Sequence, residues 1–135
     1  GLRTAGLLKF DGKTVTSVAT LPEGTHNARP FRGGVLFNDS KADVLRFVAP
    51  GRQCAFPVPR FEPDQLTHTE LGDPRIARQA FARGLCVLSD GVVAAGSSPS
   101  TIALHDLKRV KTLLTVTLSR DVRNAIHGLQ VWPFD

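Results

Sequence analysis

The stretch FRGGVLFNDS (residues 31–40) has a counterpart 57 residues later in LSDGVVAAGS (residues 88–97). Each begins on an apolar residue, turns at a glycine, continues through a short apolar run and ends on small polar residues. This is the pattern of two strands joined by a hairpin. The same spacing matches residues 44–47 with residues 101–104 without a gap, and a fourth apolar run follows in both places. The sequence therefore predicts two repeated units of four antiparallel strands.

Truncated copies of the same pattern flank these two units. Residues 8–13 (LKFDGK) resemble residues 103–108 (ALHDLK), and a strand rich in Thr and Val follows each. Residues 126–131 (IHGLQV) resemble residues 82–87 (ARGLCV). We therefore expect the chain to open with the last two strands of an earlier unit and to close with the first strand of a later one.

Nearly all of the predicted regular structure is strand. Apolar runs rich in Val, Leu, Thr and Phe recur between Gly, Asp, Ser and Pro residues, and helical periodicity is almost absent. A helix-compatible run at residues 73–81, with Asp73 as its N-cap, is the exception. The predicted strands are residues 6–10, 14–20, 35–38, 44–48, 54–58, 85–88, 92–95, 101–105, 111–118 and 128–132.

Four-stranded antiparallel units of about 40 to 45 residues are typical of β-propeller blades. The predicted fold is therefore all-β, a partial β-propeller of four-stranded antiparallel blades, with a small β-sandwich as the alternative. The chain divides into a half blade, a blade, an inter-blade excursion, a second blade and the first strand of the next blade, at residues 1–24, 25–61, 62–80, 81–119 and 120–135.

The number of predicted blades bears on the partners of the chain. Known propellers have four or more blades, and fewer than three are predicted here. We therefore expect the chain to be the C-terminal portion of a longer protein. Its partner would be a second polypeptide supplying the remaining blades or, as the alternative, further copies of itself.

Composition argues against several classes of protein. The formal net charge is +5, but the basic residues are spread singly along the 135 residues, without the clusters and aromatic platforms typical of nucleic-acid binding. No apolar stretch is long enough to span a membrane. Both cysteines, Cys54 and Cys86, lie in apolar strands, where we expect buried thiols. We expect a soluble, cytoplasmic protein that binds neither membrane nor nucleic acid.

The blade openings ARGL (residues 82–85) and IHGL (residues 126–129), the strand exit GSS (residues 96–98) and the ending QVWP (residues 130–133) carry a family resemblance. They resemble the six-bladed propeller superfamily of NHL-repeat and gluconolactonase-like proteins, and within it the DUF4915 proteins. The resemblance implies the fold, and little about activity. A lactonase-like cation site would need carboxylate and amide ligands, for which the candidates are Asn27, Asn38, Asp39 and Asn124.

The candidate site residues occupy equivalent positions in successive units. His26, Arg83 and His127 each stand at the start of a predicted innermost strand, and Asn27 follows His26. Innermost strands line the central channel of a propeller, so these side chains are predicted to converge on a ligand. His26 and His127 could bind a divalent metal ion, and the guanidinium of Arg83 could bind an anion. The alternative is that each residue only caps its blade through a backbone hydrogen bond.

Two functions follow from these residues. The sequence contains no phosphate loop, zinc-binding pair or nucleophile motif, so no catalytic residue is identified. We expect an interaction or ligand-binding scaffold. The alternative is a metal-dependent hydrolase, lyase or isomerase with its site at the channel mouth. Asp106 is expected to order a turn, and His105 beside it is expected to face solvent.

Overall fold

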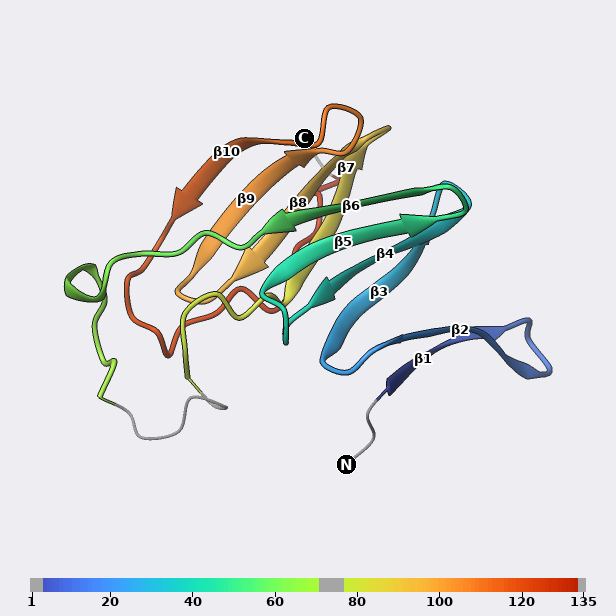
Figure 1. Cartoon of the computed structure of the whole chain (residues 1–135), viewed down its shortest axis with the longest axis horizontal. Coiled ribbons are helices and arrows are strands. Elements are labelled where there is room, and N and C mark those ends of the chain that lie inside the picture. Colours follow the sequence, from blue (N-terminus) through green and yellow to red (C-terminus); the bar gives the residue numbers. More distant parts are fainter. Residues whose placement is uncertain (1–3, 71–76, 134–135) are drawn as a thin grey trace.

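All regular structure but one short 3-10 turn is antiparallel β-sheet in the computed structural model, which describes residues 4–70 and 77–133. Figure 1 shows a two-stranded hairpin and two four-stranded sheets. The hairpin is β1 (Thr4–Phe10) and β2 (Val15–Pro22). The first sheet, in strand order, is β3 (Thr25–Phe31), β4 (Gly34–Asp39), β5 (Val44–Ala49) and β6 (Arg52–Pro57). The second is β7 (Gly84–Ser89), β8 (Val92–Ser97), β9 (Thr101–Asp106) and β10 (Lys111–Thr117).

The predicted all-β fold with four-stranded antiparallel units is confirmed. Each sheet is a meander in which consecutive strands pair, so the order in space follows the order in sequence. This arrangement is compatible with a partial propeller and with a sandwich, and the described residues form no closed barrel. Strand β3 lies where the repeat implied a strand beginning near His26, but local pattern did not identify it, because its sequence, THNARPF, lacks the alternation of apolar and polar residues that marks a half-buried strand.

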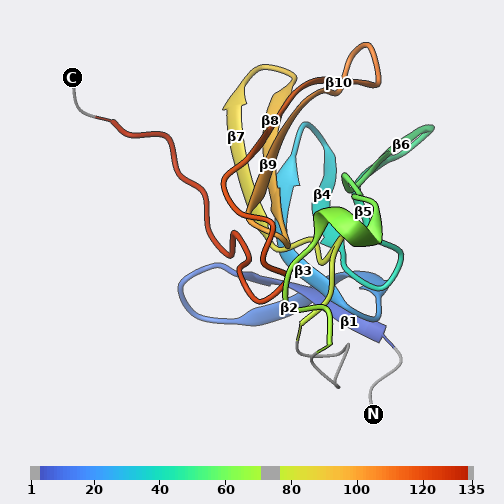
Figure 2. The same cartoon turned by 90° about the vertical axis from the view of Figure 1, so that its left-hand side faces the viewer.

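Two further predictions are corrected. The predicted strand at residues 128–132 is not a strand, because no other strand of the described chain lies beside it to share backbone hydrogen bonds. Figure 2 shows this C-terminal segment leading away from both sheets. The predicted helical run at residues 73–81 lies partly outside the described residues, and its described part, residues 77–81, is not helical.

The gapless alignment of the two units is wrong by one residue. Val48 pairs with Val35, whereas His105, which lies 57 residues after Val48, pairs with Val93 rather than with Val92. The cause is the loop between β8 and β9, which is one residue shorter than the loop between β4 and β5. Equivalent residues of β5 and β9 are therefore 57 residues apart in sequence, whereas equivalent residues of β4 and β8 are 58 apart.

The core lies between the two four-stranded sheets. Apolar side chains from both sheets form one buried cluster, in which the ring of Phe56 packs against the imidazole of His105 with their centroids 4.6 Å apart. His105 is only 2% exposed, so the prediction that it faces solvent is wrong. His105 lies in the interface because its position along β9 directs its side chain toward the core. The cluster consists of Leu36, Leu45, Phe47, Phe56, Leu85, Val93 and Leu107.

Polar side chains join the first sheet to the inner edge of the second. That edge, strand β7, has no further strand beside it, so its carbonyl groups are available as acceptors. Asn38 Nδ2 donates to the carbonyls of Arg83 and Gly84, both at 2.9 Å, and Ser40 Oγ donates to the carbonyl of Ala82 at 2.5 Å. These bonds satisfy buried backbone acceptors and fix the position of Arg83.

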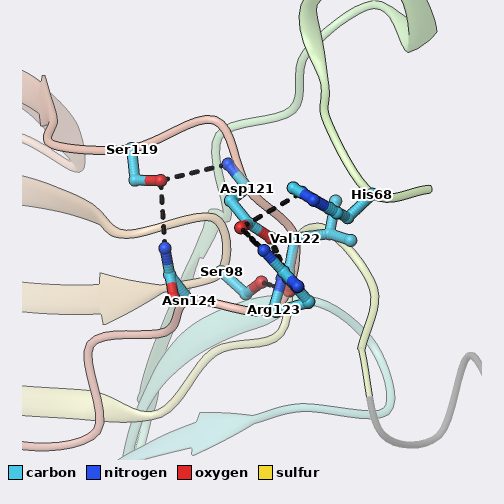
Figure 3. Close-up of polar contacts among 7 residues, drawn as sticks. All are labelled: His68, Ser98, Ser119, Asp121, Val122, Arg123 and Asn124. Carbon is cyan, nitrogen blue, oxygen red and sulfur yellow. Dashed lines mark hydrogen bonds and ion pairs between the residues drawn. The ribbon is translucent and has the colours of Figure 1, made fainter. Parts of the chain in front are cut away.

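A polar clasp, made of His68, Asp121 and Arg123, ties the segment after β6 to the segment after β10 (Figure 3). The Asp121 carboxylate accepts three hydrogen bonds from Nε and Nη2 of the Arg123 guanidinium and lies 3.2 Å from His68 Nδ1. The Arg123 guanidinium lowers the pKa of Asp121 to about 2. The Thr67 amide donates to the Arg120 carbonyl and the Thr67 carbonyl accepts from the Val122 amide, so the two segments are held side by side.

Candidate functional site

The four residues predicted to form a site come together where strand β3 meets the start of β7. Arg83 Nη1 lies 3.4 Å from Nδ1 of His26. Asn27 Nδ2 donates to the carbonyl of Arg83 and, at 3.2 Å, to the carbonyl of His127. Segments up to 100 residues apart in sequence therefore meet around one asparagine side chain. The structure brings the side chains of His26 and Arg83 together and places the His127 backbone beside Asn27, whereas the binding of a ligand by these residues stays a prediction.

Local backbone geometry places His26 and Asn27. His26 pairs with Asn38 across the ladder of β3 and β4, and the register shifts between His26 and Arg29. Asn27 stands in this irregularity with a φ of 52°, a left-handed conformation that asparagine tolerates better than most residues. The shift turns the Asn27 amide toward β7, where it bonds backbone carbonyls instead of joining the ladder.

Phe81 provides a platform for the charged part of the site. The Arg83 guanidinium carbon lies 4.2 Å from the centre of the Phe81 ring, and the His26 ring meets the same ring edge-on with centroids 6.2 Å apart. Arg83 Nε is buried without a hydrogen-bond partner, and among the described residues no carboxylate forms an ion pair with Arg83. Burial accordingly lowers the pKa of this guanidinium. The charge is retained because the pKa of arginine is far above neutral pH.

The His26 imidazole is neutral near pH 7. Burial lowers its pKa, and the nearby charges of Arg83 and His127 lower it further. Protonation of His26 would therefore add a second positive charge beside the guanidinium. A bound anion would relieve that repulsion, whereas a bound cation would increase it.

The metal prediction gains no support from the geometry. The described part of the chain contains no group of three or more His, Cys, Asp or Glu residues that could hold a metal ion. His26 and His127 offer two imidazoles, but the positive charge of Arg83, 3.4 Å from His26, disfavours a cation. A divalent ion at His26 and His127 therefore stays a prediction, while the donors present are better suited to an anion.

The four candidate ligands of a lactonase-like cation site serve other roles. The amides of Asn27 and Asn38 donate to backbone carbonyls, and Asp39 Oδ2 accepts a bond of 2.9 Å from Arg46 Nε. Asn124 Nδ2 donates to Ser119 Oγ at 3.2 Å, within the segment that carries the clasp. Each side chain stabilises a turn or an interface, and no site containing all four is formed.

The alternative role of His26 and His127 as backbone caps is also not seen. Within the described residues, neither imidazole bonds to a backbone group, and Asn27 and Asn38 make the bonds between the sheets instead. Sequence reasoning missed Asn38 as the residue that positions Arg83, and Phe81 as the ring beneath it. In the sequence, Asn38 stood out only as the polar residue that ends the apolar run VLFN.

The cysteines do not provide a nucleophile. Cys86 is buried and Cys54 is half-buried, and neither forms a disulfide. Burial raises the pKa of the Cys54 thiol, which disfavours the reactive thiolate.

Comparison with known proteins found no match to any family, curated protein or solved structure. The resemblance to NHL-repeat and gluconolactonase-like propellers therefore remains a prediction from the residues named above.

Proposed function

We propose that this chain is a β-propeller portion that acts as a ligand-binding and interaction scaffold, and that His26, Arg83 and His127 hold an anionic group, with Asn27 positioning the backbone around it. The observation that carries the proposal is the Arg83 guanidinium. It is partly desolvated, it has a buried Nε without a partner, and no carboxylate of the described chain pairs with it. An oxyanion such as a carboxylate, sulfate or phosphate group would supply the negative charge that the guanidinium lacks.

The charge pattern supports an anion over a cation or a neutral ligand. Arg83 carries a permanent positive charge, and His26 lies 3.4 Å from it. When an anion approaches, uptake of a proton by His26 becomes more favourable, and the imidazole then donates a second bond to the ligand. Affinity should therefore rise as the pH falls below 6.5, the ordinary pKa of His26.

Sulfate is the probe for this site because its charge does not change between about pH 5 and 8. The ring signals of His26 and His127 would be followed by NMR during a sulfate titration. Arg83→Gln should weaken binding by about tenfold, as expected for loss of a charge-assisted hydrogen bond.

Arg120→Gln is the matched control, since Arg120 also stacks on a phenylalanine ring, at 3.8 Å from the centre of Phe61, but stands outside the site. It should leave binding unchanged. Equal losses in the two variants, or affinity that does not rise below pH 6.5, would refute the anion site.

The metal-dependent enzyme is the alternative within the same proposal, and the proximity of His26 and His127 favours it. Metal analysis of the purified protein discriminates the two functions. One tightly bound divalent ion that is lost in His127→Ala would support the enzyme, whereas an ion-free protein that binds sulfate would support the scaffold.

Completion of the fold by a second polypeptide is part of the proposal. Hairpin β1–β2 pairs with no other described strand, and its side chains Leu8, Phe10 and Val15 are 60–66% exposed. Strand β10, the outer edge of the second sheet, exposes Leu113 and Leu114. Exposed apolar strands with unpaired edges favour association. A cytoplasmic location belongs to the same proposal and fits the two free thiols.

No helix in the described part of the chain is long and apolar enough to span a membrane. The association proposal is tested by size-exclusion chromatography with light scattering. A larger species, formed with a second polypeptide or by self-association, is expected. A stable, well-behaved species at 14.6 kDa would refute it.

A further inference from the structure

A pocket lies at the opposite end of strand β3 from His26, where hairpin turns of the two sheets meet. His26 pairs with Asn38 near the first end of the strand, and Phe31 pairs with Gly34 at the other. The pocket begins at Phe31 and has a volume of about 280 Å³. This is at the small end of the range for ligand pockets, which suits a molecule built on one ring.

The base of this pocket is apolar and aromatic. The rings of Phe31 and Phe47 meet edge-on, with centroids 5.9 Å apart and planes at 81°. Leu107, from the turn that follows β9, closes the base from the second sheet. Phe47 and Leu107 belong to the buried core, so the base of the pocket is part of the rigid interface between the sheets. It can accept the face of a planar apolar group.

The rim of the pocket carries an excess of positive charge. Arg32 and Lys108 both pair with the carboxylate of Asp90, Lys108 at 3.5 Å. Arg52 is different: its Nη2 donates to the carbonyl of Leu107 at 2.6 Å, and no described carboxylate pairs with it. Three cations therefore surround the opening, and the one carboxylate beside them, Asp90, pairs with only two of them.

The geometry holds the Arg52 guanidinium over the pocket. Its carbon lies 5.7 Å from the centre of the Phe47 ring, and its hydrogen bond to the Leu107 carbonyl ties it to the opposite sheet. The stem of Lys108 packs over Gly91, which has a φ of 120° and leaves room for it. Arg52 is therefore oriented by a contact across the interface and Lys108 by a contact within the second sheet, which lowers the entropic cost of binding a ligand between them.

We propose that this pocket binds a small aromatic monocarboxylate, with its ring on Phe31 and Phe47 and its carboxylate against Arg52 and Lys108. The apolar base selects for the ring, and the unpaired guanidinium selects for the acid. This site is separate from the His26 and Arg83 site, because the two lie at opposite ends of β3. Substitutions at one should leave binding at the other unchanged.

Benzoate is the probe for the pocket, and benzyl alcohol, which has the same ring without the charge, is the comparison. Backbone amide signals of Gly91 and Leu107 would be followed by NMR, since the Leu107 amide bonds to the Gly91 carbonyl at 2.7 Å beside the pocket. Benzoate should shift both signals in a saturable way. Benzyl alcohol should bind at least about tenfold more weakly.

Two variants with opposite expected effects separate binding from folding. Arg52→Gln should weaken benzoate binding by about tenfold, and Asp90→Asn should strengthen it by removing the carboxylate that competes for Arg32 and Lys108. A misfolded variant cannot gain affinity, so Asp90→Asn keeps the test valid if Arg52→Gln proves unstable. Arg109→Gln is the matched control, because Arg109 is an exposed cation on the turn that carries Lys108 and does not line the pocket.

The outcomes are distinct. Saturable benzoate binding that Arg52→Gln weakens, Asp90→Asn strengthens and Arg109→Gln leaves intact would support the proposal. Equal binding of benzyl alcohol, equal losses in Arg52→Gln and Arg109→Gln, or the absence of shifts at Gly91 and Leu107 would overturn it. Arg83→Gln, which tests the sulfate site, should not alter benzoate binding.

Discussion

His105 should make the protein lose stability in mild acid. The imidazole is 2% exposed, it packs against the Phe56 ring, and its Nδ1 lies 3.0 Å from the Thr112 hydroxyl. Burial lowers the pKa of His105 from its ordinary 6.5 to about 4. A proton on this ring would put a charge in the core between the two sheets, where none of the described carboxylates forms an ion pair with it.

The size of this loss of stability follows from the difference between the pKa of His105 in the folded chain and its ordinary value in the unfolded chain. Above pH 6.5 the ring is neutral in both the folded and the unfolded chain, so it contributes no pH dependence. Between pH 6.5 and about 4 the unfolded chain binds a proton that the folded chain does not, and stability falls as the pH falls. Since one pKa unit corresponds to about 1.4 kcal/mol, the loss amounts to about 3 kcal/mol by pH 4.

Urea unfolding at several pH values would measure this loss, with His105→Asn as the comparison. Asparagine retains a polar atom near Thr112 but does not titrate, so the variant should be less stable at pH 7 and lose less stability on acidification. The difference between the two curves isolates His105 from the carboxylates, which titrate in both proteins. Parallel curves for wild type and His105→Asn between pH 6.5 and 4 would refute the reasoning.

Two further substitutions test the contacts that hold the site and the C-terminal segment. Gly96→Ala should destabilise the fold by about 1–3 kcal/mol in thermal unfolding, because its Cβ would lie 2.5 Å from Ile126 Cγ2, whereas Gly128→Ala, with open space around it, should have little effect. Asn38→Ala should cost about 1–3 kcal/mol and also weaken sulfate binding, because the buried amide bonds the Arg83 carbonyl; an unchanged unfolding midpoint would contradict its role in joining the sheets.

Local sequence patterns predicted most of the strands because strands and tight turns depend on neighbouring residues. The glycines at positions 33 and 91 turn with φ values of 73° and 120°, which explains why the hairpins could be recognised from their composition. The same reasoning failed at β3, whose polar sequence forms a strand because β4 pairs with it. It failed again at residues 128–132, where an apolar run has no described strand beside it.

The candidate site was predicted in part. Repeat positions indicated that His26, Arg83 and His127 would converge, and they do so around Asn27.

The sequence alone determined most of the strands, the turns and the four-stranded units, because alternation and turn chemistry act over a few residues. Only the tertiary structure determined that His105 is buried and that Arg83 lies on Phe81 without a carboxylate partner. It also determined the pocket at Phe31, because that pocket is formed by side chains of two sheets whose pairing depends on contacts between residues far apart in the chain.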